Sequence, residues 1–244
     1  MKRVTALLLA AMIITTGLIT PAMAAEDDVP ETYSNAYVVM DAKTGQVLLQ
    51  KNMYEKEYPA SITKILTTAL GLTYAKPEDR ITVSQETVSD VWKWGETTHL
   101  ALEPGEIITL KDALYGAMVE SANDCANAIA QAVSGSLTDF AELMNQQVAA
   151  LGLSDTHFTN AHGLPDKDHY TTAYDMARIT RWAMTVPGLR NISARRSIPS
   201  PRPTKRMWQE TSVPTTICWW KALTTIPTLR AASLVGPPRR SIRR

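Results

Sequence analysis

The order of the patterned segments constrains the fold of this 244-residue chain more than any other feature. Between residues 33 and 188, most runs rich in β-branched and aromatic residues precede most runs with helical periodicity. The expected strands are 36–40, 46–49, 80–83 and 107–110, and the expected helices are 61–75, 111–120, 122–133, 137–151 and 172–184. The sequence has no internal repeat. The order of strands before helices excludes an alternating βαβ unit, because the parallel strands of such a unit need a crossover helix between them.

Two local signals mark the ends of expected elements. Residues 41–45 (Asp-Ala-Lys-Thr-Gly) lie between the first two strand-like runs and are typical of a hairpin turn, because glycine tolerates the backbone angles of a tight turn. Thr172 is followed three residues later by Asp175, a spacing that resembles a capping box at a helix start. Both signals support antiparallel strands followed by helices.

Ser61 and Lys64 open the first expected helix. A helix places residues three apart on one face, so the Lys64 ammonium can reach the Ser61 hydroxyl. Serine becomes a nucleophile when a base takes its proton, and a lysine with a lowered pKa can be that base. The same spacing also arises by chance on solvated helices, so this pair alone leaves a structural reading open.

Ser121 and Asn123 form a second motif about sixty residues further on, at an expected junction between two helices. A serine there can pass a proton to a leaving group, and an asparagine amide can orient a lysine and bind a substrate carbonyl. Ser121 can equally be a helix N-cap. Ser-x-x-Lys followed by Ser-x-Asn is far more specific than either motif, and it indicates a penicillin-recognising serine enzyme.

The first 24 residues are typical of an export signal. Lys2 and Arg3 precede an uncharged apolar run, and residues 22–24 (Ala-Met-Ala) offer a cleavage site, which places the mature start near Ala25. An uncleaved membrane anchor is the alternative, and no later segment predicts an anchor helix. The two cysteines make no disulfide framework, and the four histidines have no metal-site spacing, so we predict no metal and no cofactor.

The end of the chain differs sharply in composition from the rest. Residues 186–244 contain 12 of the 25 Lys and Arg residues, one of the 24 Asp and Glu residues and 8 of the 14 prolines, without strand or helix periodicity. We predict a disordered basic tail at 191–244. A nucleic-acid or anionic-lipid arm is one interpretation, but we expect no nucleic-acid partner for an exported chain. We favour a shifted reading frame, because the codons for residues 218–221 encode Leu-Val-Glu when read one nucleotide earlier.

From about Tyr33 to Ser193 the chain resembles the low-molecular-mass penicillin-binding proteins that are D-alanyl-D-alanine carboxypeptidases. The resemblance rests on residues 58–64, 102–106, 119–124, 160–165 and 169–177. It implies a serine β-lactamase-like α/β (α+β) fold, with a helical cluster packed on an antiparallel sheet that lacks its C-terminal strands. The incomplete catalytic domain would span residues 25–190. His162 and Asp175 are interpreted as residues that support the fold.

The resemblance also implies the chemistry. Ser61 would be the acylated nucleophile, Lys64 its base, Ser121 a proton carrier and Asn123 a support for Lys64 and the substrate amide. The substrate would be a peptidoglycan stem peptide ending in D-Ala-D-Ala, with β-lactams as covalent inhibitors, and the enzyme would act outside the cytoplasmic membrane at the cell wall.

One element of this family is missing after Ser121, a Lys-Thr-Gly motif on a strand that forms one wall of the cleft. The only such triplet is 43–45, which precedes Ser61 and lies on the expected hairpin turn. Two functions therefore remain: a working carboxypeptidase, or an inactive remnant that at most binds muropeptide or a β-lactam. A β-lactamase is a third reading, but no residue is identified as its deacylating acid.

Overall fold

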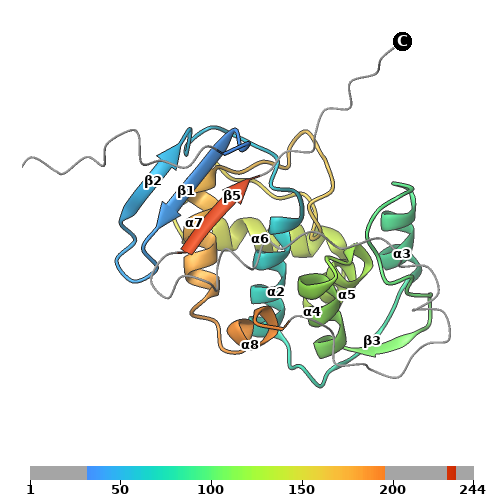
Figure 1. Ribbon diagram of the computed structural model, residues 1–244. Helices are drawn as coiled ribbons and strands as arrows, with labels where there is room; N and C mark the ends of the chain where they lie inside the picture. Colours follow the sequence, from blue (N-terminus) through green and yellow to red (C-terminus); the bar gives the residue numbers. More distant parts are fainter. Residues whose placement is uncertain (1–31, 196–229, 235–244) are drawn as a thin grey trace, which may run out of the picture. The chain divides into compact units, whose positions relative to one another are not determined.

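The protein is described by a computed structural model that covers residues 32–195 and 230–234 (Figure 1). Its larger sheet is antiparallel with the strand order β2–β1–β5. The strands are β1 (Ala36–Met40), β2 (Val47–Lys51) and β5 (Arg230–Leu234). Alternate side chains of β1 are buried, at Ala36, Val38 and Met40, as expected for a strand with one face on the core. The predicted hairpin between β1 and β2 is confirmed.

The helices form a cluster against this sheet. They are α2 (Thr63–Tyr74), α3 (Gln85–Trp92), α4 (Leu110–Val119), α5 (Asn123–Ser134), α6 (Leu137–Ala150), α7 (Ala173–Ala183) and α8 (Leu189–Ser193), with a single turn η2 (Ala60–Ile62) before α2. Helix α7 packs on β1 and β5, and α2 contacts α4, α5, α6, α7 and α8 (Figure 1). A helical cluster packed on an antiparallel sheet was the predicted fold class, and it is confirmed.

A second, two-stranded sheet pairs β3 (Arg80–Thr82) with β4 (Ile107–Thr109). Helix α3 follows β3 and was not predicted. Ser84 caps it, since its hydroxyl accepts a hydrogen bond from the Thr87 N–H, and Val88 and Val91 on one face are buried. This spacing of an N-cap and two apolar residues is the signal that could have identified α3.

Side-chain caps begin four of the helices, α3, α4, α6 and α7. Thr172 caps α7 as predicted, but the expected capping box is only half formed. The Asp175 carboxylate accepts a hydrogen bond from the Thr156 hydroxyl at 2.7 Å instead of turning back to the cap. The complete box is at α4, where Thr109 and Asp112 bond reciprocally.

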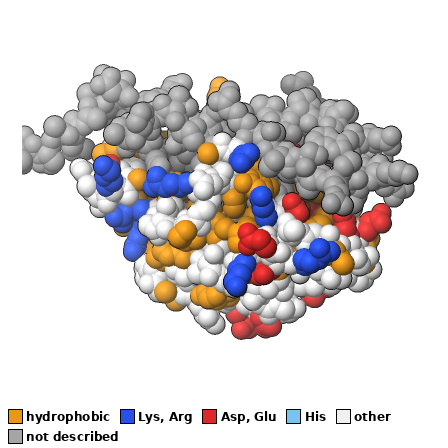
Figure 2. All heavy atoms as spheres, turned by 90° about the horizontal axis from the view of Figure 1, so that it is seen from below, with side chains coloured by type: hydrophobic (Ala, Val, Ile, Leu, Met, Phe, Trp, Pro, Cys, Tyr) orange, Lys and Arg blue, Asp and Glu red, His pale blue; other side chains and the backbone are white. Residues whose placement is uncertain are grey.

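The core lies between the central helices. Leu66 and Leu70 of α2, Leu114 of α4 and Ile129 of α5 are fully buried. Helices α4 and α5 approach closely because Gly116 has no side chain, and a Cβ at that position would overlap the Cys125 sulfur. On the outside, Figure 2 shows one face of the molecule, where acidic and basic side chains are interspersed with apolar ones.

Two elements reach into the segment that was expected to be a disordered tail. Helix α8 crosses the boundary expected after residue 190 and buries Leu189 and Ile192, so the folded part continues into the expected tail. Residues 230–234 form β5, so the prediction of no regular structure is wrong for these five residues. Strand pairing uses backbone N–H and C=O groups, and this stretch has no proline to interrupt it. Pairing therefore does not require an alternating side-chain pattern.

The predicted export signal, residues 1–24, and most of the tail, residues 196–229 and 235–244, lie outside the described residues. Within the described part of the chain, every helix is too short or too polar to cross a lipid bilayer. Cys125 is a free, buried thiol whose pKa is raised by burial, and Cys218 lies in the part that is not described.

Candidate active site

The nucleophile candidate Ser61 lies on the turn η2, immediately before α2. Ala60 in front of it has a φ of +49°, a left-handed conformation that is strained for a residue with a side chain. The strained turn carries Ser61 to an exposed position, whereas Lys64, in the first turn of α2, is fully buried. The Lys64 Nζ donates to Ser61 Oγ at 3.2 Å, so the predicted pair forms within one turn.

Ser121 reaches the same lysine from the junction between α4 and α5. Its φ of +58° is also left-handed, and its Oγ accepts a hydrogen bond from Lys64 Nζ at 3.5 Å. Asn123 begins α5, where it is buried and its backbone N–H donates to the Thr98 carbonyl. The structure thus brings Ser61, Lys64 and Ser121 together. Lys64 bonds to the two serines and to a backbone carbonyl, and a contact between Lys64 and Asn123 stays a prediction.

The shortest hydrogen bond of Lys64 goes to a residue that the sequence did not place in the site. Its Nζ donates to the backbone carbonyl of His162 at 2.8 Å. A backbone acceptor leaves no side-chain signature, so motif reasoning had no means of finding it. The ammonium is therefore held between two hydroxyls and one carbonyl, and the carbonyl fixes its position.

Burial shifts the protonation equilibrium of Lys64. Its buried surroundings disfavour the charged form and lower the pKa of Lys64 from 10.5 to about 7, although the nearby Asp124 carboxylate opposes the shift. Near neutral pH a large fraction of the amine is then unprotonated. An unprotonated amine within hydrogen-bonding distance of a serine hydroxyl can accept its proton.

The buried histidine His169 supports the turn that carries Ser61. The Thr159 N–H donates to His169 Nδ1 at 3.1 Å, so the proton of the neutral ring is on Nε2, which donates to Thr63 Oγ1 at 3.0 Å. Burial lowers the pKa of His169 to about 4, which keeps the ring neutral. Thr63 is the first residue of α2, so this network anchors the helix start beside Ser61.

A turn at residues 160–164 packs directly against Ser61's turn. The Asn160 side-chain oxygen accepts from the His162 and Gly163 N–H groups, and its amide donates to the Leu164 carbonyl. Gly163 has a φ of +89°, and a Cβ there would overlap the carbonyl group of Ala60. Only glycine permits this approach, which places the His162 carbonyl at Lys64.

Asp124 organises the other side of the junction. It is fully buried, and its carboxylate accepts hydrogen bonds from the Leu100 and Leu102 N–H groups at 3.0 Å each. A third bond comes from the Cys125 N–H at the start of α5. These bonds tie the loop before β4 to the helix that begins beside Ser121.

The triplet 43–45 does not contribute to this site. It forms the β1–β2 turn, where the Asp41 carboxylate accepts from the Lys43 and Thr44 N–H groups. Arg181 of α7 donates to the carbonyls of Ala42 and Lys43. The motif thus connects the hairpin to α7.

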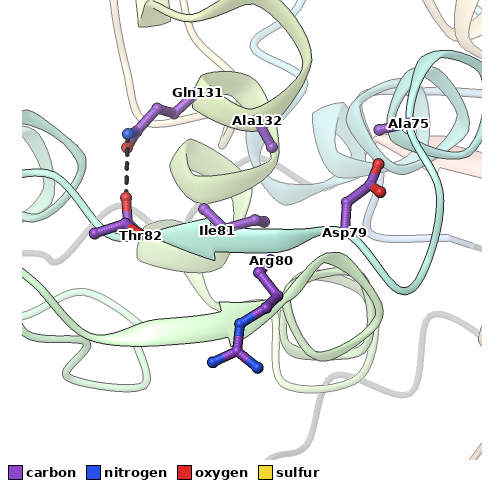
Figure 3. A pocket seen from close by; sticks show the side chains of 7 residues that line it. All are labelled: Ala75, Asp79, Arg80, Ile81, Thr82, Gln131 and Ala132. Carbon is purple, nitrogen blue, oxygen red and sulfur yellow. Dashed lines mark hydrogen bonds between the residues drawn. The ribbon is translucent and has the colours of Figure 1, made fainter.

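A hollow of about 250 Å³ lies elsewhere, between β3 and the C-terminal part of α5 (Figure 3). Its floor includes Ile81 and Thr82, and the Gln131 amide donates to the Thr82 carbonyl at 3.2 Å. None of the predicted site residues lines it. Among the described residues, no group of three His, Cys, Asp or Glu side chains could hold a metal ion.

Comparisons with known proteins identify the family of the chain. The sequence profile of the D-alanyl-D-alanine carboxypeptidase family matches residues 22–209, which is most of the chain. The chain belongs to this family. It is 36% identical over 187 residues to D-alanyl-D-alanine carboxypeptidase DacF of Bacillus subtilis, covering 72% of this chain and 46% of that protein. It is 32% identical over 158 residues to DacD of Escherichia coli, covering 62% and 41%.

Solved structures have the same fold. Penicillin-binding protein 6B of Escherichia coli superimposes with a TM-score of 0.67 and 27% identity, over 78% of this chain and 63% of that one. A D-alanyl-D-alanine carboxypeptidase of Mycobacterium tuberculosis gives a TM-score of 0.65 and 26% identity, over 72% and 64%. The chain spans about half the length of the curated relatives it matches.

Proposed function

We propose that this chain is a serine D-alanyl-D-alanine carboxypeptidase that acts through an acyl-enzyme on Ser61. The observation that carries the proposal is the position of Lys64 Nζ, 3.2 Å from Ser61 Oγ and 3.5 Å from Ser121 Oγ. Because its pKa is lowered, Lys64 can act as the base, and no histidine is needed for this step. The names of the relatives supply the substrate class, a peptide that ends in D-Ala-D-Ala.

The steps follow from these three side chains. Unprotonated Lys64 takes the Ser61 proton, and Ser61 Oγ attacks the carbonyl carbon of the penultimate D-Ala. The amide C–N bond then breaks, and Ser121 passes a proton from Lys64 to the departing amine of the terminal D-Ala. Water attacks the Ser61 ester, releases the shortened peptide and restores the serine. Asn123 is proposed to bind the substrate amide at the start of α5.

One observation favours a weaker activity than this mechanism alone suggests. The sequence has no Lys-Thr-Gly after Ser121, and in this family that strand would pair with the substrate carboxylate and supply an oxyanion N–H. Loss of one oxyanion donor alone lowers a rate about 10²–10³-fold. The second candidate function is therefore an inactive remnant that binds muropeptide or a β-lactam without turnover.

A fluorescent penicillin distinguishes the candidates. We expect a covalent band on the purified chain that is absent in Ser61→Ala, and release of D-Ala from a peptide ending in D-Ala-D-Ala. Labelling without D-Ala release would support the remnant. No labelling of folded protein would refute acyl transfer at Ser61, and rapid hydrolysis of the penicillin would favour a β-lactamase.

We also propose that residues 1–24 direct export and that the chain acts at the cell wall outside the cytoplasmic membrane. The uncharged apolar run after Lys2 and Arg3 supports this proposal. N-terminal sequencing of protein recovered from outside the cytoplasm should begin near Ala25. A chain that still begins at Met1 would indicate the uncleaved anchor.

The tail is proposed to be translated from a shifted reading frame. The family profile ends its match at residue 209, close to the interval of residues 192–208 in which we place the shift. Resequencing the gene tests this, since a single-nucleotide insertion or deletion in that interval is expected. An unbroken reading frame confirmed on both strands would refute it.

A further inference from the structure

The backbone carbonyl of His162 accepts a hydrogen bond from Lys64, and the side chain of His162 is 2% exposed. The Leu164 N–H donates to His162 Nδ1 at 3.1 Å, so the proton of the neutral ring is on Nε2. Burial lowers the pKa of His162, although Asp90 opposes the shift, so the ring is neutral at pH 7.

The remaining ring proton is donated to a carboxylate on another element. His162 Nε2 lies 2.9 Å from Asp90 Oδ2, on the last turn of α3. The same oxygen accepts from the Asn127 amide of α5 at 3.0 Å, and the other oxygen pairs with Lys93 at 2.6 Å. These hydrogen bonds, led by that of His162, keep the pKa of Asp90 well below its usual range, so the acceptor is ionised.

We propose that Asp90 is a positioning residue for the base: by holding the ring of His162, it fixes the backbone carbonyl that accepts the hydrogen bond of Lys64. The chain of contacts runs from α3 through Asp90 and His162 to the amine that activates Ser61. The kinetic part of this inference rests on the proposed acyl transfer, whereas its geometric part concerns Lys64 alone.

A direct effect of the Asp90 charge is separable from positioning. Burial disfavours the charged form of Lys64, the Asp124 carboxylate favours it, and the nearby Cys125 thiol is neutral because burial raises its pKa. His162 is faced by Asp90, Lys64 and Lys93. If Asp90 acts through geometry, a neutral side chain that still accepts the hydrogen bond from His162 should keep the position of the His162 carbonyl. A side chain without a hydrogen-bond acceptor should not.

The test compares three variants in the full chain. Asp90→Asn keeps an oxygen for His162 but loses the charge, and Asp90→Ala loses both. Lys93→Ala is the matched control, because it removes only the exposed partner of Asp90. The readout is the titration midpoint of Lys64, followed by the NMR signal of ¹³Cε-labelled lysine and assigned by its loss in Lys64→Met.

We expect Lys93→Ala and Asp90→Asn to keep the wild-type midpoint and Asp90→Ala to lower it by about one pH unit, because the ammonium loses a fixed acceptor. The acylation rate of Asp90→Ala with a fluorescent penicillin should fall about tenfold at its high-pH plateau, and Asp90→Asn should restore it. An unchanged midpoint in folded Asp90→Ala would overturn the proposal, as would equal shifts in both Asp90 variants.

A replacement variant and an independent readout cover two ways in which this experiment could fail. If Asp90→Ala does not fold, Asp90→Ser takes its place, since its shorter side chain stays polar but does not reach His162. If the wild-type chain is not acylated at all, the proposed function fails, while the titration of Lys64 still judges the positioning role.

Discussion

Replacing Gly163 tests whether the turn at residues 160–164 packs directly against the turn that carries Ser61. The φ of +89° costs an alanine about 1 kcal/mol relative to glycine. The added Cβ would also overlap the carbonyl group of Ala60 and come within 2.9 Å of Thr63 Oγ1. Because the Ala60 atoms are backbone, no side-chain rotation relieves the overlap, and the turns must separate. We expect Gly163→Ala to lower the free energy of unfolding by about 3–5 kcal/mol.

Gly135→Ala provides the matched control. Gly135 ends α5 with a φ of +80°, and a Cβ there would meet no atom within 4 Å. This variant should lose only the conformational part, about 1 kcal/mol. Urea unfolding followed by tryptophan fluorescence gives both values, with similar denaturant slopes expected.

Gly163→Ala and Gly135→Ala should also differ in the acylation of Ser61. Separation of the turns moves the His162 carbonyl away from Lys64, so Gly163→Ala should lose labelling of Ser61 by a fluorescent penicillin, while Gly135→Ala should keep it. Equal destabilisation of the two variants, together with normal labelling of Gly163→Ala, would refute the reasoning.

Three further results are expected. Lys64→Arg should lower Ser61 acylation about 10²–10⁴-fold in a penicillin-labelling time course, because arginine stays protonated and cannot act as a base; labelling at the wild-type rate would exclude Lys64 as the base. His169 has a pKa near 4 in the folded chain against 6.5 as its ordinary value, so protons favour the unfolded state. The contribution of neutral His169 to stability should therefore be fully present above pH 6.5 and fall by about 3 kcal/mol as the pH drops toward 4; urea unfolding should show this loss in the wild type, and His169→Asn should lack it. Asp124→Asn should destabilise the fold by about 1–3 kcal/mol in thermal unfolding, since an amide oxygen replaces a carboxylate that accepts several N–H donors; an unchanged melting temperature would contradict this.

Local patterns predicted most of the elements well. The strand at residues 36–40 matches β1, and the helix expected at 137–151 corresponds to α6 at 137–150. These segments have strong periodicity or clear turn residues, so nearby sequence determines them. The segments that were missed are short. Helix α3 has only 8 residues and α8 only 5, and each is stabilised mainly by packing on α5 or α4.

The proximity of the candidate side chains was predictable from sequence motifs. Ser61, Lys64 and Ser121 were named from two motifs, and the structure places both hydroxyls within hydrogen-bonding distance of the amine. The supports were not predictable, because they use backbone groups or contacts distant in sequence. The His162 carbonyl is separated from Lys64 by 98 residues and the Asp90 carboxylate from the His162 ring by 72, and neither spacing has a motif.

In the proposed mechanism, nucleophile activation and substrate recognition use different parts of the chain. Every group shown to hold Lys64, namely Ser61, Ser121 and the His162 carbonyl, lies between residues 60 and 164, within elements that pack around α2. The missing Lys-Thr-Gly strand would act on the substrate carboxylate and the oxyanion, after the serine has been activated. Under the proposed mechanism, changes in the tail would alter how a substrate is held rather than how Ser61 loses its proton. We therefore expect penicillin labelling of Ser61 to be less sensitive to changes in the tail than release of D-Ala from a peptide.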